Sequence, residues 1–315
     1  MITYDIAIIG GGPAGLTAGI YASRALMKTL LLEKIAPGGL VITTEKVENY
    51  PGFSDGISGY ELMQQIEKQG TKFGLEILSE EVIMISEKDK VFNIKTTTQN
   101  YKALSVIIAT GTTYRKLGVE GEDLFFGHGI SNCATCDGPL YKDKEVIVVG
   151  GGDAAVEEAL FLTKFVRKIY LVHRRDRLRA TAILQERAKA NNKIEFVWNS
   201  AVSRIYGRNK IEKVTIKNLI DNKEKDLSID GVFVFIGFET HTEFLKDFIE
   251  LDENGYVITD SEMGTSRQGI FAAGDVRSHT LRQIISACGD GARAAVSAQH
   301  FVENLRGTSY DKVVR

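Results

Sequence analysis

Two cysteines separated by two residues are the residues of this chain whose type and spacing most directly suggest chemistry. Cys133 and Cys136 stand in the run Cys-Ala-Thr-Cys-Asp, which ends at Asp137. At this spacing both sulfurs can meet on one face of a turn that begins a helix, and a helix start favours the thiolate. Such a pair can cycle between dithiol and disulfide. The alternatives are two ligands of a zinc site and two buried, unpaired thiols.

A zinc site is disfavoured because zinc usually takes four ligands and the sequence holds no second Cys-x-x-Cys pair. We therefore expect no bound metal. The third cysteine, Cys288, lies in a stretch of helical periodicity and is interpreted as a small core residue. His241, His279 and His300 are interpreted as ordinary surface or packing residues, and we assign them no catalytic or binding role.

Glycine-rich loops flank the cysteine pair on both sides. The loop at 10–15 reads Gly-Gly-Gly-Pro-Ala-Gly, and the loop at 150–155 reads Gly-Gly-Gly-Asp-Ala-Ala. Each follows an apolar segment and precedes a segment of helical periodicity, which is the context in which such a loop binds a dinucleotide. The pyrophosphate is then held by backbone amides at the start of the helix.

The residues that follow the two loops differ in charge. Glu33 lies 23 positions after Gly10, and His173 lies 23 positions after Gly150. A carboxylate at this point can accept hydrogen bonds from a ribose and would repel a 2′-phosphate, so the first loop suits FAD or NAD. His173 is instead followed by Arg174 and Arg175, whose guanidinium groups match a 2′-phosphate. The second loop therefore suits NADPH.

A repeated order of strand, glycine loop, helix and strand must position these residues. The expected strands are 5–9, 29–32, 104–110, 145–149, 168–172, 232–237 and 269–275, and the expected helices are 16–25, 154–164 and 281–305. The repeat predicts an α/β fold with two dinucleotide-binding units.

The C-terminal part lacks a glycine loop of its own, so we expect it to complete the first domain. This predicts an FAD-binding domain formed by residues 1–113 and 243–315, with an NADPH-binding domain that carries the cysteine pair, residues 114–242, inserted between them. The chain then crosses the domain junction twice, and we expect hinge segments near 113–116 and 238–242.

Composition excludes several classes of protein. The chain has 315 residues and a formal net charge of −2, which gives no sign of the basic surface that nucleic-acid binding requires. No apolar run approaches the roughly 20 residues needed to span a membrane. An apolar strand pattern begins almost at the first residue and leaves no room for a signal peptide, so we expect a cytoplasmic protein.

Together these motifs resemble the low-molecular-weight thioredoxin reductases over nearly the whole chain. The resemblance rests on the two glycine loops, Val47–Gly52, Cys133–Asp137, His173–Asp176 with Arg179, and Ala273–Asp275 followed by Arg282 and Gln283. It implies two Rossmann-like, three-layer ββα domains and a homodimer. It also implies that a hydride passes from NADPH to FAD and reduces the disulfide, which then reduces oxidised thioredoxin by dithiol–disulfide exchange.

The resemblance also implies roles for the three residues of the cysteine motif. Cys136 would be the thiol next to the flavin, and Cys133 would attack the substrate disulfide. Asp137 would act as general acid and base, although an aspartate there could also cap the helix. The nicotinamide and the dithiol would both lie on the inserted domain and use one edge of the flavin, so this domain must rotate between half-reactions.

The cofactor-binding residues combine the loops with positions carried over from the family. For FAD they are Gly10, Gly12, Pro13, Ala14, Gly15, Glu33, Gly38, Gly39, Leu40, Asn49, Val82, Ala109, Gly111, Gly274, Asp275, Arg282, Gln283 and Ile284. For NADPH they are Gly150, Gly152, Asp153, Ala154, Ala155, His173, Arg174, Arg175 and Arg179. Leu40 departs from the glutamine that is common in the family, and 237–242 lacks the usual proline and asparagine.

Two other functions remain as alternatives. One is a flavin-dependent reductase or oxidase that acts on another dithiol or disulfide, and the basic cluster at 173–179 argues against an oxidase that would not need NADPH. The other is a non-catalytic sensor of NADPH or a metal, which would leave the cysteine pair without a flavin.

Overall fold

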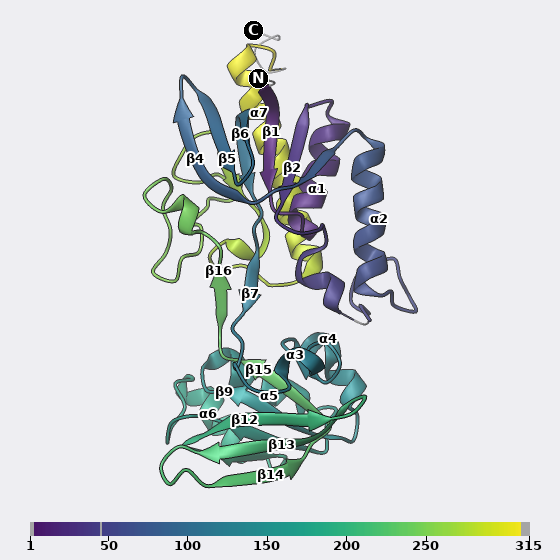
Figure 1. Cartoon of the computed structure of the whole chain (residues 1–315), viewed down its shortest axis with the longest axis vertical. Coiled ribbons are helices and arrows are strands. Elements are labelled where there is room, and N and C mark those ends of the chain that lie inside the picture. The colour runs from purple at the N-terminus through teal and green to yellow at the C-terminus, as the bar shows by residue number, and fades with distance from the viewer. Residues whose placement is uncertain (1–2, 45, 310–315) are drawn as a thin grey trace. The chain divides into compact units, whose positions relative to one another are not determined.

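The chain folds into two compact units in the computed structural model, which describes residues 3–44 and 46–309 (Figure 1). Unit 1 contains the chain up to Thr113 and again from Glu239 onward, and unit 2 is Tyr114–Phe238. We expected the chain to return to the first domain at 243, and it re-enters unit 1 at Glu239.

A mainly parallel sheet forms the centre of unit 1. Its strands are β1 (Thr3–Ile9), β2 (Thr29–Glu33), β3 (Glu76–Ser79), β4 (Val82–Lys88), β5 (Val91–Thr96), β6 (Asn100–Ile108) and β17 (Ile270–Ala272). They lie in the order β3-β2-β1-β6-β5-β4, with β17 beside β6, and β5 is antiparallel to both of its neighbours, β6 and β4. Because β17 pairs in parallel with β6, with Ile270 opposite Val106, the C-terminal part completes the first unit.

The helices in the described part of unit 1 are α1 (Pro13–Arg24), α2 (Gly59–Lys72) and α7 (Ile284–Arg306). α1 and α7 lie in close contact, and a Cβ atom added at Gly291 of α7 would come within 2.1 Å of the carbonyl oxygen of Ala14. The helix expected from 281 begins at Ile284, because Gln283 has extended backbone angles and its N–H donates to the Ser286 hydroxyl. Shorter 3-10 turns span Gly39–Thr43, Glu243–Leu245 and Gly274–Val276.

Unit 2 has three layers. Its parallel sheet, in the order β11-β10-β9-β15-β8, consists of β8 (Ile130–Ser131), β9 (Glu145–Gly150), β10 (Lys168–Val172), β11 (Ile194–Val197) and β15 (Gly231–Phe235). An antiparallel sheet is formed by β12 (Ser200–Gly207), β13 (Ile211–Asn218) and β14 (Glu224–Ser228). The helices are α3 (Glu122–Phe125), α4 (Ala134–Asp137), α5 (Asp153–Leu162) and α6 (Ala182–Ala190), with a 3-10 turn at Gly138–Tyr141.

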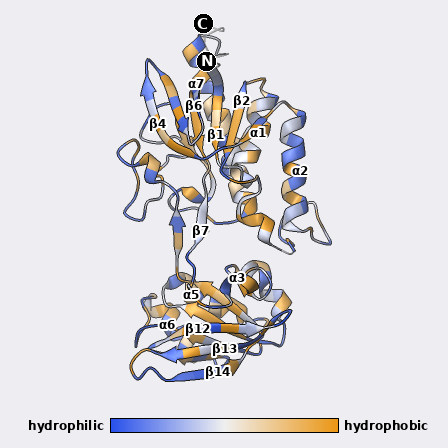
Figure 2. Cartoon of the chain, in the orientation of Figure 1, coloured by the Kyte–Doolittle hydropathy of each residue, from blue (hydrophilic) through white to orange (hydrophobic). Residues whose placement is uncertain are grey.

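Alternating side chains of β9 separate the two cores of unit 2. Val146 and Val148 pack in the core shared with α5 and α6, whereas Ile147 and Val149 pack in the core shared with β12 and β13. Successive residues of a strand point to opposite faces, so the apolar run at 146–149 of this strand contributes to both cores. Figure 2 shows hydrophobic residues concentrated in the central strands and hydrophilic residues along β14.

The two chain crossings between the units run beside each other as paired strands. They are β7 (Thr112–Tyr114) and β16 (Phe238–Thr240). On the unit 1 side, the Thr113 hydroxyl lies 3.1 Å from Nε2 of His241. On the unit 2 side, the rings of Tyr114 and Phe238 are 5.1 Å apart. Among the described residues, no helix is long and apolar enough to cross a membrane.

Candidate functional site

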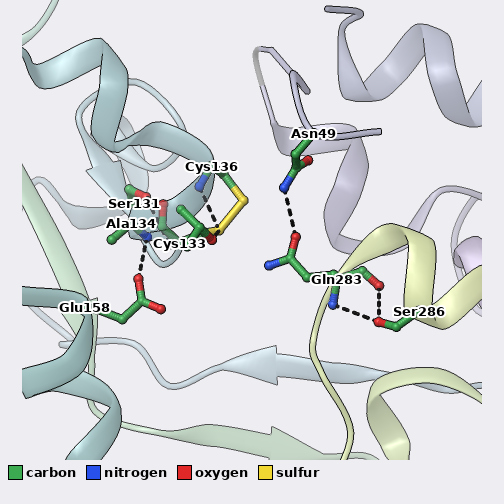
Figure 3. Close-up of a disulfide and its surroundings, with 9 residues drawn as sticks. Asn49, Ser131, Cys133, Ala134, Cys136, Glu158, Gln283 and Ser286 are labelled. Atoms are coloured by element: carbon green, nitrogen blue, oxygen red, sulfur yellow. Dashed lines mark hydrogen bonds between the residues drawn. A yellow bond between two sulfur atoms is a disulfide. The ribbon is translucent and has the colours of Figure 1, made fainter. Parts of the chain in front are cut away.

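A disulfide joins Cys133 and Cys136 at the start of α4 (Figure 3). The S–S distance is 2.13 Å, and Cys133 is the residue that caps the helix. The Cys136 N–H donates to the Cys133 sulfur at 3.2 Å, and the Thr135 hydroxyl lies 3.3 Å from the same sulfur. These two groups can stabilise negative charge on Cys133 after reduction. Within 3–44 and 46–309, no three His, Cys, Asp or Glu side chains form a group that could hold a metal.

Glu158 is a polar contact of this turn that the sequence analysis missed. It lies on α5, and its Oε2 accepts a hydrogen bond from the Ala134 N–H at 2.9 Å (Figure 3). Burial raises the pKa of the Glu158 carboxyl, while the Ala134 N–H acts in the opposite direction. No motif marks this residue, because it joins the cysteine turn only through the packing of α4 on α5.

The first glycine loop leads from β1 into α1, with Gly10 at a φ of 106° and Gly12 in extended backbone. Gly12 caps the helix and Pro13 occupies its first turn, where a missing N–H costs nothing. A Cβ atom at Gly15 would lie 1.9 Å from the Gly10 carbonyl oxygen, so this approach requires glycine. Glu33 ends β2, and its Oε2 accepts the Gly11 N–H at 2.7 Å. The predicted ribose acceptor therefore lies directly at the loop.

Other predicted FAD residues come from distant parts of unit 1. The Asn49 amide donates to Oε1 of Gln283 at 3.0 Å (Figure 3). Asp275 Oδ1 is buried and, within the described part of the chain, has no hydrogen-bond partner. Burial raises the pKa of Asp275 to about 6, with Arg282 acting in the opposite direction. A buried acceptor of this kind fits the hydroxyl groups of a flavin side chain.

All predicted FAD positions belong to unit 1, and all predicted NADPH and cysteine positions belong to unit 2. Leu40 lies in the 3-10 turn at Gly39–Thr43, Val82 begins β4, Ala109 directly follows β6, and Ile284 begins α7. A Cβ atom at Gly39 would lie 3.2 Å from Gly12, which places this turn against the first loop.

The second glycine loop leads from β9 into α5 and brings the basic segment to its side. Gly152 caps α5 in extended backbone, and a Cβ atom added there would meet nothing within 4 Å. The Gly151 carbonyl accepts the Arg179 N–H at 2.7 Å. Asp153 Oδ1 accepts the Thr181 N–H at 2.6 Å, so the chain at Arg179 and Thr181 is tied to the loop and to the start of α5.

His173 and the arginines beside it differ in environment. His173 is buried under the loop, where a Cβ atom at Gly151 would lie 2.3 Å from its ring. Burial lowers the pKa of His173, and the nearby Arg175 and Arg179 lower it further. Arg174, Arg175 and Arg179 are exposed, and none of them forms an ion pair among the described residues. Burial and the nearby arginines therefore favour the neutral form of the histidine, and the arginines can bind an external anion.

Two dinucleotide-binding units, one of which carries a redox disulfide, define a disulfide oxidoreductase that uses a flavin and a nicotinamide. The pyridine nucleotide-disulphide oxidoreductase family matches residues 4–291, and the chain belongs to this family.

The most similar relatives include named thioredoxin reductases. The protein from Treponema pallidum is 45% identical over 303 residues, covering 96% of this chain and 98% of the relative. The protein from Bacillus subtilis is 46% identical over 306 residues, covering 97% and 96%. The crystal structure of thioredoxin reductase from Streptococcus pyogenes aligns with a TM-score of 0.92 at 45% identity, covering 96% of this chain and 99% of that chain. The predicted fold class and family resemblance are thereby confirmed.

Proposed function

We propose that this protein is an NADPH-dependent thioredoxin-disulfide reductase in which unit 1 binds FAD and unit 2 binds NADPH. The observation that carries the proposal is the disulfide between Cys133 and Cys136 on the unit that also holds the second glycine loop. The relatives named thioredoxin reductase, at 45% and 46% identity over nearly their whole length, support thioredoxin as the substrate.

Unit 1 offers the groups that FAD binding requires. The amides at the start of α1 would hold the pyrophosphate, Glu33 the adenosine ribose, and Asp275 a hydroxyl of the flavin side chain. When bound, FAD supplies the two-electron transfer that connects a nicotinamide to a disulfide. In unit 2, the amides at the start of α5 would hold the pyrophosphate of NADPH. Arg174, Arg175 and Arg179 would bind its 2′-phosphate.

The cysteine turn then performs the exchange with the protein substrate. The Cys133 thiolate attacks one sulfur of oxidised thioredoxin and releases the other as a thiolate, forming a mixed disulfide. Cys136 next attacks Cys133, which restores the enzyme disulfide and releases the second thioredoxin sulfur. Asp137 is placed by the same short helix and would deliver the protons that the two released thiolates take up.

We further propose rotation of unit 2 about the β7 and β16 crossings, and assembly as a homodimer. Solved relatives support rotation within the family. The structure of Lactococcus lactis thioredoxin reductase titled as the FR conformation covers 96% of this chain at 43% identity, yet aligns at a TM-score of 0.66. The Streptococcus pyogenes relative, of nearly equal identity and coverage, aligns at 0.92, so these two relatives differ from each other in overall arrangement.

The decisive experiment mixes the purified protein with NADPH and a disulfide dye, with and without thioredoxin. We expect dye reduction that depends on thioredoxin in the wild type. In Cys136→Ser the bound flavin should still be reduced by NADPH, while electron output to thioredoxin should vanish.

Cys288→Ser is the matched control, because Cys288 is the third cysteine and lies in α7, outside the redox turn. It should keep thioredoxin-dependent turnover. Rapid dye reduction without thioredoxin, or thioredoxin-dependent turnover that survives in Cys136→Ser, would count against the proposed function.

A further inference from the structure

Glu158 places a carboxylate beside the residue that must become a thiolate. Its Oε2 accepts the Ala134 N–H at 2.9 Å, and the Thr135 N–H also favours its ionised form. Ala134 is fully buried and directly follows Cys133 in the chain (Figure 3). The negative charge of Glu158 is therefore next to the point at which negative charge appears when the disulfide is reduced and ionised.

The charged residues on the elements that pack around the cysteine turn are all acidic. α4 packs against α5 and the 3-10 turn at Gly138–Tyr141. The charged residues of these three elements are Asp137, Asp153, Glu157 and Glu158, and their other titratable groups are the cysteines and Tyr141. Burial raises the pKa of Glu158, and Glu157 raises it further, because a second negative charge is unfavourable there. The same burial and nearby negative charge would disfavour a Cys133 thiolate.

These acidic neighbours oppose the lowering of the thiol pKa that the start of a helix usually causes. Cysteines at helix starts can have a pKa far below the ordinary 8.5, and stabilising the thiolate makes a dithiol a weaker electron donor. In unit 2 the Cys136 N–H and the Thr135 hydroxyl contact the Cys133 sulfur, whereas the N–H of Ala134, the residue next to Cys133, donates to the Glu158 carboxylate.

Resting on the proposed function, we propose that Glu158 is a positioning residue that keeps the Cys133–Cys136 dithiol strongly reducing. Its carboxylate holds the backbone of the turn at Ala134, and its charge opposes the Cys133 thiolate. Reduction of the disulfide takes up two electrons and two protons and gives two thiols. Ionisation of Cys133 then releases one proton to solvent, and Glu158 acts on this last equilibrium.

The first measurement is the thiol pKa of Cys133 in the holoenzyme. A Cys136→Ser, Cys288→Ser background leaves Cys133 as the single cysteine of the chain. The rate of alkylation by iodoacetamide is measured against pH in this background, with Glu158 intact and with Glu158→Gln. Glu157→Gln is the matched control, because it removes one negative charge from the exposed neighbouring residue. Glu158→Gln should lower the Cys133 pKa by about one unit, which is a tenfold gain in thiolate below that pKa. Glu157→Gln should change it much less.

The second measurement is the disulfide reduction potential in the enzyme with both cysteines, read by alkylation after equilibration with dithiothreitol buffers. Above the Cys133 pKa of both proteins, Glu158→Gln should favour the reduced form about tenfold, or about 30 mV for two electrons. Below both pKa values the difference should disappear, because the thiol is then protonated in each protein.

Glu158→Ala separates charge from structure, since glutamine keeps an acceptor for Ala134 and alanine does not. The proposal is overturned if Glu158→Gln keeps the wild-type Cys133 pKa and potential, whether or not alanine changes them. It is also overturned if Glu157→Gln has an equal effect. Neither measurement uses NADPH or thioredoxin. A wild-type enzyme that fails to reduce thioredoxin would therefore refute the proposed function, while the Cys133 pKa and the disulfide reduction potential could still be measured and interpreted.

Discussion

Arg174 and Arg175 are the residues on which the choice of nucleotide should depend. Both are exposed beside the second glycine loop, and burial together with the arginines lowers the pKa of the neighbouring His173. We expect replacement of both arginines by alanine to weaken NADPH binding by about 2–3 kcal/mol, the range for charged hydrogen bonds, and to leave NADH binding nearly unchanged.

Titration of the flavin-reduction rate against each nucleotide measures this effect. Arg167→Ala is the control, because Arg167 precedes β10 and pairs with Glu145 rather than with the loop. Equal losses for NADPH and NADH in the double variant would show that the arginines do not read the 2′-phosphate.

Asp275 gives a prediction about stability and pH. Its pKa in the folded protein is about 6, above the ordinary 3.8, because burial disfavours the charge. The folded state therefore binds this proton more tightly than the unfolded state, and the stability that the group contributes falls as the pH rises from 3.8 to about 6. In FAD-free protein at pH 7, Asp275→Asn should raise the free energy of unfolding, by about 3 kcal/mol at most.

Urea unfolding at pH 4 and pH 7 tests this expectation, with the exposed Glu253→Gln as a control. The gain from Asp275→Asn should shrink toward pH 4, and FAD should bind more weakly to the variant. A gain of equal size at both pH values would place its cause outside this ionisation.

At the scale of elements, the contact between α1 and α7 depends on a missing side chain. A Cβ atom at Gly291 would lie 2.1 Å from the Ala14 carbonyl oxygen, whereas one at Gly289 on the same helix meets nothing within 4 Å. We expect Gly291→Ala to destabilise unit 1 by about 1–3 kcal/mol, the usual range for overpacking.

Gly289→Ala is the matched control and should stabilise α7 by about 0.5–1 kcal/mol, because alanine favours a helix interior. Thermal unfolding and FAD retention measure both variants. Similar melting temperatures for the two variants would contradict the close packing of α7 on α1.

The elements that the sequence predicted well are those with strong apolar patterns beside a glycine loop. β9 and β10 match their expected ranges to within one residue, and in the structure the C-terminal part lies in unit 1, where β17 pairs with β6. β14 was missed because its sequence, Glu-Lys-Asp-Leu-Ser, has almost no apolar pattern and becomes a strand only by pairing with β13.

The site residues also fall into two groups, those whose place in the fold follows from a sequence pattern and those that only the packing of the chain brings together. The place of Glu33 at the end of β2 beside the first glycine loop follows from the strand pattern, and its Oε2 accepts the Gly11 N–H; its role in binding a ribose stays a prediction. Glu158 was not predictable, since its link to Ala134 arises from helix packing and leaves no pattern in the sequence. The pairing of Asn49 with Gln283 joins residues far apart in the chain, and only the family resemblance pointed to both.

At the scale of the whole molecule, the proposed rotation can be followed with one label on each unit. Leu26 in unit 1 is 92% exposed and Ile220 in unit 2 is 75% exposed, so cysteines there should accept dyes without disturbing either core. In the oxidised enzyme, single-molecule energy transfer between Leu26→Cys and Ile220→Cys should show two populations whose ratio changes when NADPH is added. A single distance that persists throughout turnover would contradict rotation.

Pairing of β17 with β6 and packing of α7 on α1 also determine the order in which the molecule can form during synthesis. The ribosome makes β6, then all of Tyr114–Phe238, and only afterwards the partners that β6 and α1 need. Domains tend to fold as units while the chain emerges, so the inserted unit can finish first while the earlier half of unit 1 waits with its apolar surface uncovered. A chain that pauses once Tyr114–Phe238 has emerged from the ribosome would therefore carry a folded unit 2 attached to an incomplete unit 1, whose uncovered apolar surface is prone to aggregation.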